Sequence, residues 1–178
     1  MKLGSLIGAD SAIVFFVPEL DSIVERARSF CPESVDPGIA AHITVNYPFM
    51  IQENDLEVIV ARLADSVEEF GAFEFRLTEL RRWPTTLYLK PEPDSVFRAI
   101  IAAVWKAFPQ SPPYGGRFQD VVPHLTIVES SEVEEIDASE SELRTELTAK
   151  LPIAARAAEL HLIVKSGSEW NRVARVSL

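Results

Sequence analysis

Two short motifs in this chain of 178 residues combine an imidazole with a hydroxyl. The first occupies residues 42–45 and reads His-Ile-Thr-Val, and the second occupies residues 124–127 and reads His-Leu-Thr-Ile. Side chains two apart in an extended strand point to the same face, so each histidine shares a face with its threonine. The apolar residues between and after them can then face a core. Each motif therefore predicts a strand that holds one imidazole beside one hydroxyl.

Two such units in one cleft would suit acid and base chemistry at phosphorus. A free imidazole has a pKa of about 6.5, so one histidine can act as a neutral base while the other acts as a protonated acid. In-line displacement needs this division, because one oxygen loses a proton as it attacks and another gains a proton as it departs. The hydroxyls of Thr44 and Thr126 are short, stiff donors that can hold the remaining phosphoryl oxygens.

A metal site is the main chemical alternative for paired histidines. Catalytic zinc usually takes three protein ligands, and neither motif has a carboxylate or a further histidine at ligand spacing. The third histidine, His161, lies in the apolar run Leu160–Val164 and is interpreted as a structural or surface residue on the outer face of a strand. We therefore expect no metal and no other cofactor.

Composition limits the classes of partner. With 47% hydrophobic residues the chain can bury a core, and its net charge of -10 argues against broad binding to long nucleic acid. Eight of the 27 acidic residues fall between Glu129 and Glu146, against the single basic residue Arg144, which is typical of a solvated helical face. The single cysteine, Cys31, is interpreted as an incidental thiol.

The N-terminus lacks the basic and apolar pattern of a signal peptide, and no apolar run approaches the roughly 20 residues that cross a bilayer. We expect a soluble, cytoplasmic monomer that does not contact membranes. The monomer is an expectation by default, because no feature of the sequence decides the oligomeric state.

Hydrophobic periodicity predicts the order of the elements. The first part is expected to contain strands at 11–17, 42–46 and 72–80 and helices at 19–30 and from Asn54 or Asp55 to Phe70. The second part is expected to contain strands at 85–89, at the second motif, at 155–164 and at 173–176, with helices at 94–108 and 139–150. A loop at 109–118 and a turn at Gly167 complete the pattern.

The order strand, helix, His-x-Thr strand, helix, strand occurs twice. The chain is therefore interpreted as a single domain, 1–178, built from approximate structural repeats at 11–81 and 82–178. Two pseudo-symmetric lobes packed face to face would bring His42 and His124 to one central cleft.

The residues resemble a known family. The paired motifs look like those of the 2H phosphoesterase superfamily, specifically its 2'-5' RNA ligase branch. Further likeness comes from Ala12–Leu20 (AIVFFVPEL), Tyr47-Pro48-Phe49, Pro112–Gly116 and Val122-Pro123. Together these segments span most of the chain.

The resemblance implies a bilobal α+β fold with an antiparallel sheet and flanking helices in each lobe and an active-site cleft between them. It implies metal-free opening of 2',3'-cyclic phosphates to 2'-phosphates, with 2'-5' RNA ligation as a reverse activity. His42 and His124 would be the catalytic pair, and Thr44 and Thr126 would bind the phosphate. By analogy His124 would activate water and His42 would protonate the departing 3' oxygen, although a near-symmetric site can exchange these roles.

One position departs from the family pattern. Several relatives place an arginine shortly after the second motif, where this chain has Val128-Glu129-Ser130. Arg117 in the 109–118 loop can supply a cation, and Tyr114 or Phe118 can offer a stacking face for a base, as an alternative to a plain surface arginine in a loop. Further substrate-binding candidates are Tyr47, Arg81 and Arg82.

Two other functions remain open. The chain can be a non-catalytic module of the same fold that binds a nucleotide or an RNA end, or a scaffold that uses the acidic helix as a partner surface. The complete set of two histidines and two threonines favours the enzyme. The sequence does not choose between a mononucleotide, an RNA end and an ADP-ribose cyclic phosphate as the substrate.

Overall fold

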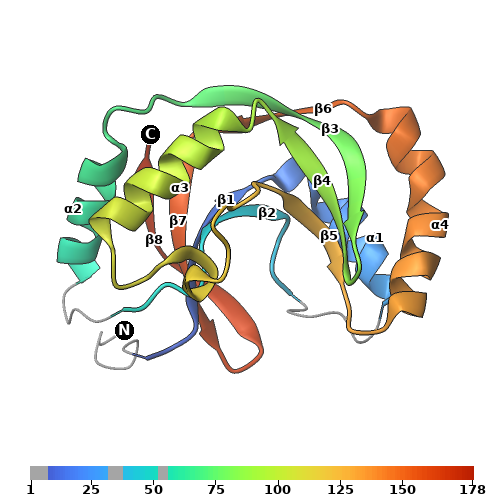
Figure 1. Cartoon of the computed structure of the whole chain (residues 1–178), viewed down its shortest axis with the longest axis horizontal. Helices are drawn as coiled ribbons and strands as arrows, with labels where there is room; N and C mark the ends of the chain where they lie inside the picture. The colour runs from blue at the N-terminus through green and yellow to red at the C-terminus, as the bar shows by residue number, and fades with distance from the viewer. Residues whose placement is uncertain (1–7, 32–37, 52–55) are drawn as a thin grey trace.

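The fold is known from a computed structural model that describes residues 8–31, 38–51 and 56–178. Eight strands form one antiparallel sheet in the order β6-β3-β4-β5-β2-β1-β7-β8. The sheet curls into an arch with β2 and β5 at its centre, and the hairpins β3–β4 and β7–β8 form its two legs (Figure 1).

The sheet consists of two four-stranded halves, which we call the β2 half and the β5 half. The β2 half contains β1 (Ser11–Phe16), β2 (His42–Asn46), β7 (Glu159–Ser166) and β8 (Glu169–Ser177). The β5 half contains β3 (Phe73–Trp83), β4 (Thr86–Glu92), β5 (Leu125–Glu129) and β6 (Ile153–Ala157). The halves meet where β2 pairs with β5, at Ile43 and Leu125. This arrangement confirms the α+β class with antiparallel sheets.

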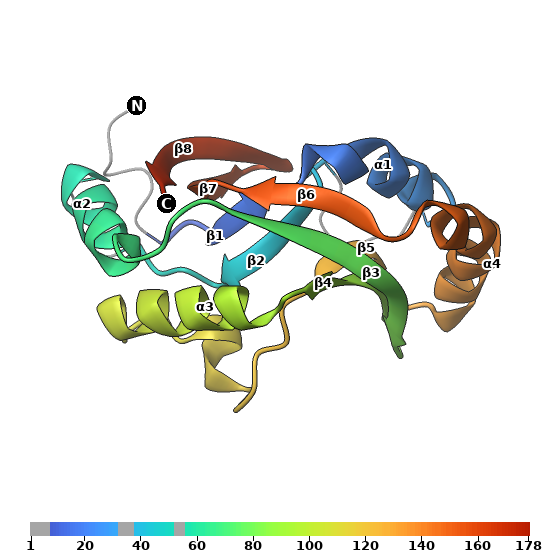
Figure 2. The ribbon, with the colours of Figure 1, turned by 90° about the horizontal axis from the view of Figure 1, so that it is seen from above.

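Four α-helices cover the sheet in the described part of the chain. They are α1 (Asp21–Ser29), α2 (Leu56–Val67), α3 (Ser95–Ala107) and α4 (Val133–Lys150). Figure 2 shows α2 and α3 at one end of the sheet and α1 and α4 at the other. Aromatic side chains join the layers, because the ring of Phe97 on α3 lies 5.6 Å from that of Phe15 and 5.0 Å from that of Phe75. These edge-to-face contacts bury large apolar area in the core.

Most predicted elements are confirmed, and two predictions are wrong. The last helix begins at Val133 and not at 139, because Ile136 and Ser139 are buried in line with Leu143 and Leu147. The predicted strand 155–164 is two strands that separate at Ala158, since β6 pairs with β3 and β7 pairs with β1. The predicted caps of α2, Asn54 and Asp55, lie outside the described residues.

The chain exchanges strands between the two halves. β3, which belongs to the first approximate repeat, pairs with β4 and β6 in the β5 half. β7 and β8, which belong to the second, pair beside β1 in the β2 half. The repeats at 11–81 and 82–178 stay a prediction about the sequence. In the structure, each half of the sheet contains strands from both approximate repeats.

None of the helices in residues 8–31, 38–51 and 56–178 combines the length and the apolar character that crossing a membrane requires.

Candidate active site

The central pairing of β2 with β5 brings the two His-x-Thr motifs together. Ile43 and Leu125 are antiparallel partners, and both are fully buried on the core side. Continuing this register by one residue in each direction sets His42 opposite Thr126 and His124 opposite Thr44. Alternation along a strand then turns all four side chains to the other face of the sheet. The four groups therefore alternate, histidine across from threonine, around a local two-fold axis.

These four residues line one pocket of about 290 Å³ under the arch. The pocket is formed from both halves of the sheet and from the segment before β5. Its lining also includes Ala12, Arg28, Ile39, Tyr47, Tyr114, Ile127, Val128, Glu129 and Trp170. The pocket thus joins His42, His124, Thr44, Thr126, Tyr47 and Tyr114 from the sequence-based site.

Both histidine rings are oriented by the same local hydrogen bond. His42 Nδ1 lies 2.9 Å from the carbonyl oxygen of Ala40, and His124 Nδ1 lies 2.8 Å from that of Val122. A carbonyl oxygen can only accept, so Nδ1 carries the hydrogen in each ring. This leaves Nε2 of each histidine to exchange protons. One imidazole can therefore take a proton and the other can give one, each through the same atom.

His124 lies against an aromatic wall at the β3–β4 leg. The ring of Trp83 lies 4.7 Å from the imidazole and that of Tyr88 lies 5.5 Å from it, both edge-to-face, and these two rings lie 4.1 Å apart. Burial lowers the pKa of His124, against a smaller opposite effect of its hydrogen bond to Val122. Loss of water around the ring disfavours the imidazolium ion. His124 is therefore biased toward the neutral form that a base requires.

His42 has different neighbours. The ring of Phe16 on β1 is an aromatic contact of His42, with 6.5 Å between ring centroids. Phe16 also contacts His161 on β7, at 5.0 Å, and the guanidinium carbon of Arg172 on β8 lies 3.9 Å from its ring centroid. Burial, followed by the charge of Arg172, lowers the pKa of His161. His161 thus faces the concave side of the sheet, the face that carries His42 and Thr44, so the expected position on the outer face is wrong. Its interpretation as a structural residue stays a prediction.

A tight loop closes one side of the pocket. The Tyr114 amide donates a hydrogen bond of 2.5 Å to the carbonyl oxygen of Tyr47, and Tyr114 adopts φ +52°, a left-handed conformation that is uncommon for a non-glycine residue. Gly115 and Gly116 continue the turn with φ +64° and +75°. The short 3-10 helix Pro113–Gly116 thereby holds the Tyr114 ring at the pocket. Burial, assisted by the charge of Glu129, raises the pKa of Tyr114 to about 12.

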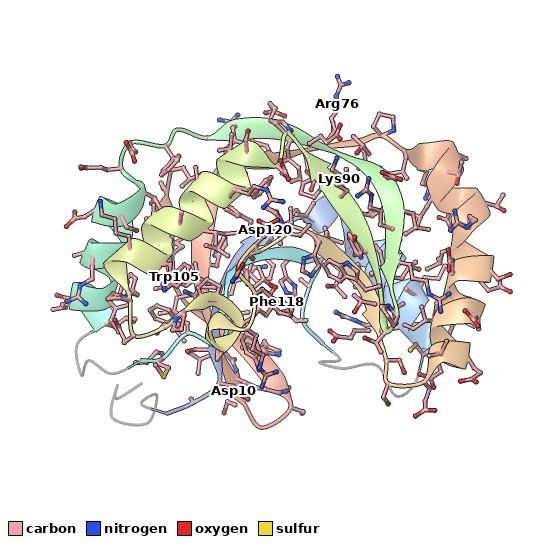
Figure 3. All side chains as sticks on the ribbon, in the orientation of Figure 1. Asp10, Arg76, Lys90, Trp105, Phe118 and Asp120 are labelled. Carbon is pink, nitrogen blue, oxygen red and sulfur yellow. The ribbon has the colours of Figure 1, made fainter. Side chains whose placement is uncertain are left out.

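Two candidates from the same loop lie farther out. Phe118 packs edge-to-face on Tyr114 at 5.6 Å but is 55% exposed, and Figure 3 shows it on the segment between α3 and β5, in front of the arch. Arg117 is also exposed. Neither residue lines the pocket. Their role toward a substrate stays a prediction.

Three residues that sequence reasoning missed also line the pocket. Arg28 comes from α1 and brings a positive charge, and Ile39 precedes β2. Trp170 comes from β8, and its buried indole Nε1 has no hydrogen-bond partner among the described residues. No local motif marks these residues, because they reach the site only through the fold.

Arg81 and Arg82 pair with carboxylates. Arg81 lies 2.8 Å from Glu79. Arg82 lies 2.5 Å from Asp137 and 3.0 Å from Glu140 on α4, and these hydrogen bonds raise its pKa. Arg82 thus joins the β3–β4 leg to α4. Part of the acidic segment between Glu129 and Glu146 is therefore paired with basic residues of the same chain.

The described residues contain no cluster of three His, Cys, Asp or Glu side chains that could hold a metal ion. The expectation of metal-free chemistry stays a prediction.

The arched antiparallel sheet with its flanking helices is a fold that is also represented among solved structures. E. coli LigT complexed with 3'-AMP superimposes with a TM-score of 0.57 at 18% identity, over 96% of this chain and 98% of that chain. TT0787 of Thermus thermophilus gives 0.61 at 14% identity, over 95% and 97%. Kluyveromyces marxianus Usb1 gives 0.55 at 12% identity, over 94% and 97%. At these identities the likeness concerns the fold.

The family follows from the sequence itself. The model of the 2'-5' RNA ligase superfamily matches residues 16–169, so the chain belongs to that superfamily. A search of curated proteins found no match. The match confirms the family that the two motifs predicted.

Proposed function

We propose that the protein is a metal-independent phosphodiesterase that opens 2',3'-cyclic phosphates on a nucleotide or an RNA end to give 2'-phosphates. The observation that carries the proposal is the alternating set of two histidines and two threonines in one pocket. Two imidazoles supply both proton transfers, and two hydroxyls supply donors for the phosphoryl oxygens. The same groups, used in the opposite direction, would support 2'-5' ligation.

In the proposed mechanism His124 is the base and His42 is the acid. His124 Nε2 takes a proton from water as the water oxygen attacks phosphorus. The bond from phosphorus to the 3' oxygen breaks, and His42 Nε2 gives its proton to that oxygen, which leaves the phosphate on the 2' oxygen. The lowered pKa of His124 supports this direction, because its neutral form is then available at neutral pH.

Thr44 and Thr126 are proposed to hold the two non-bridging oxygens. Each hydroxyl is carried by a strand and lies in register opposite the histidine of the other motif. A donor that is already oriented stabilises the charge that develops on these oxygens in the transition state.

The proposed ligand is nucleotide-sized. Solved structures of E. coli LigT are complexes with 3'-AMP, ATP and NADP+, which supports nucleotide recognition by this fold. A pocket of about 290 Å³ matches the lower end of small-molecule sites. We assign Tyr47 and Tyr114 to its wall, with Phe118 and Arg117 contacting parts of the substrate that extend outward.

Product analysis with purified protein tests the proposal. The panel contains 2',3'-cyclic mononucleotides, a short RNA with a 2',3'-cyclic end and ADP-ribose cyclic phosphate, each with and without a chelator. We expect a single 2'-phosphate product that the chelator does not suppress, and its loss in H42A and H124A. An intact panel, or full activity in both variants, would refute the proposal.

The same experiment separates the enzyme from a binding module. A binding module would retain nucleotide through a long incubation and release no product. Charge reversal on the exposed face of α4 separates both from a scaffold, because it would change complex formation and leave cyclic phosphates untouched.

A further inference from the structure

A larger groove of about 840 Å³ lies beside the catalytic pocket on the β2 half. Phe16 and Ala40 line this groove, and both also contact His42, through the ring pair at 6.5 Å and the hydrogen bond to the Ala40 carbonyl oxygen. The groove therefore adjoins His42, which lines the catalytic pocket. Its wall also contains His161, Arg172 and Arg175. A substrate longer than one nucleotide can extend into it.

Arg172 has an unusual environment for a charged residue in this chain. Its guanidinium lies on the face of Phe16, 3.9 Å from the ring centroid, and it makes no ion pair with any carboxylate in the described part of the chain. Stacking on an aromatic ring fixes the guanidinium plane and leaves its N–H edges free to donate. In a chain with a net charge of -10, this arginine offers an un-neutralised positive charge in a fixed position.

Unlike Arg172, the other basic side chains of the groove wall lie close to carboxylates. Arg175 lies 3.5 Å from Glu159, and His161 lies 3.9 Å from the same carboxylate. Arg156, which also lines the groove, lies 3.9 Å from Glu74. The anionic residues of the groove wall are Glu159 and Asp21, and Asp21 accepts a hydrogen bond of 2.8 Å from the Ala41 amide. Arg172 is thus the arginine of this wall that keeps its donors for a ligand.

Distance along the sheet suits a second phosphate of the substrate. Arg172 belongs to β8 but reaches back over β7, so its guanidinium lies above Phe16 on β1, the strand next to β2. Neighbouring strands lie about 4.8 Å apart, so the guanidinium over Phe16 lies about one strand spacing from the strand that carries His42. In a substrate with a 2',3'-cyclic end, any further phosphate must lie on the 5' side of that nucleotide.

We propose that Arg172, held on Phe16 beside His161, binds a second phosphate group of the substrate, on the 5' side of the nucleotide that carries the cyclic phosphate. This inference rests on the proposed function and narrows its substrate class. The preferred substrate then carries at least one phosphate besides the cyclic one. A diester in an oligonucleotide and a terminal 5'-phosphate share this chemistry.

Three adenosine substrates test the inference. The first is the 2',3'-cyclic mononucleotide, the second is the same compound with a 5'-phosphate, and the third is a dinucleotide with a 2',3'-cyclic end. We expect wild-type kcat/KM to be higher for the second or third than for the first. R172A should lower that preference about tenfold, the value of one charge-assisted hydrogen bond. A preference for the 5'-phosphorylated mononucleotide would identify the second group as a terminal phosphate, and a preference for the dinucleotide would identify it as a diester.

R76A is the matched control, because it removes one arginine from another strand. Arg76 on β3 is exposed and points away from the arch in Figure 3. We expect R76A to keep the wild-type preference, and F16L to lose it together with R172A, since both break the stack. Equal losses on all three substrates in R172A, or a wild type without any preference, would overturn the inference.

A binding measurement keeps this test separate from the test of catalysis. Its probe is the fluorescently labelled dinucleotide 2'-phosphate, titrated into wild type, R172A and R76A. Weaker binding to R172A alone supports the subsite even if no cyclic phosphate is opened, in which case only the proposed activity fails. Equal binding by all three proteins, or none, refutes the subsite.

Discussion

The two halves of the sheet carry the same motif in different surroundings. His124 in the β5 half lies among Trp83 and Tyr88, which exclude water from the ring. His42 in the β2 half has Phe16 as an aromatic neighbour, and the guanidinium of Arg172 lies over the face of that ring. The backbone contact of each imidazole is nevertheless the same. The local hydrogen bond is therefore repeated, while the outer contacts differ.

This difference shows how a near-symmetric site can make one histidine the base and the other the acid. The repeated contact to a carbonyl oxygen fixes the same tautomer in both rings, so it cannot distinguish base from acid. Burial can distinguish the base from the acid, because it favours the neutral form of the imidazole. We propose that the aromatic wall of the β5 half, which buries His124, provides the asymmetry that the motifs lack.

The largest expected effect separates the two histidines by their roles. H42A and H124A should each slow the opening of a 2',3'-cyclic nucleotide by about 10²–10⁴-fold, the usual contribution of a general acid or base. A nucleoside p-nitrophenyl phosphodiester has a leaving group that departs without a proton. On this substrate H42A should recover most of its activity and H124A should not, as measured by steady-state kcat/KM. Recovery in H124A instead would reverse the assignment of base and acid.

The next effect concerns the hydroxyls of Thr44 and Thr126, whose loss should lower kcat equally in the two halves. T44V and T126V keep the shape of the side chain and remove its donor. Each should lower kcat about a hundredfold, as expected for the loss of one preorganised donor at a developing oxyanion. Parallel circular dichroism would check that the fold is retained. A wild-type rate in one variant would mean that its threonine does not contact the phosphate. The strand register would then be symmetric while the contacts to the phosphate are not.

A smaller effect tests the aromatic wall directly. In W83A water reaches His124, the imidazolium ion becomes less unfavourable, and the pKa of His124 rises toward its ordinary value of about 6.5. Less of the neutral base is then present in mild acid, so the acidic limb of the kcat/KM profile should move to higher pH.

Trp170 provides the control for this shift. It lies at the other leg of the arch, and its aromatic contact is Tyr47 at 6.4 Å rather than a catalytic histidine. W170A should therefore leave the position of the acidic limb where it is in the wild type. A limb that moves equally in both variants, or in neither, would remove the aromatic wall as the source of asymmetry.

The smallest effect concerns the ion pairs between the β3–β4 leg and α4. R82A should lower the melting temperature slightly at neutral pH, because exposed ion pairs contribute little. Hydrogen bonds from Arg144 and then Arg82 lower the pKa of Glu140, so this stabilisation is present above the unfolded pKa and is lost as the pH falls through the folded one. Melting curves of R82A and wild type should converge in acid. A gap that widens in acid would contradict this account.

The sequence predicted the elements whose periodicity is strong. The β2 strand and α3 follow from alternation and from helical spacing, and the two motifs identified the candidate catalytic groups before any geometry was known. The start of α4 was missed because its first turn contains Glu134 and Glu135, whose charge hides the buried Ile136. Polar residues in an exposed first turn look like loop when only apolar periodicity is read.

The remaining errors have a physical source in long-range pairing. Nothing in the composition around Ala158 marks a break, and the two strands there separate only because their partners lie in different halves of the sheet. Arg28 and Trp170 reach the pocket from α1 and β8 for the same reason. Contacts of this kind depend on strand order, which local propensity does not encode.

The exchange of strands at Ala158 has a consequence for how the protein is made. β1 has β7 as its outer neighbour, so its edge stays open until residues 159–166 have left the ribosome. Contacts between such distant segments form late, since closing long loops slows folding. A nascent or truncated chain that lacks the last hairpin would carry both histidines and still expose an unpaired strand beside one of them. We therefore expect activity to emerge only after β7 and β8 have been synthesised, and a chain truncated before β7 to lack it.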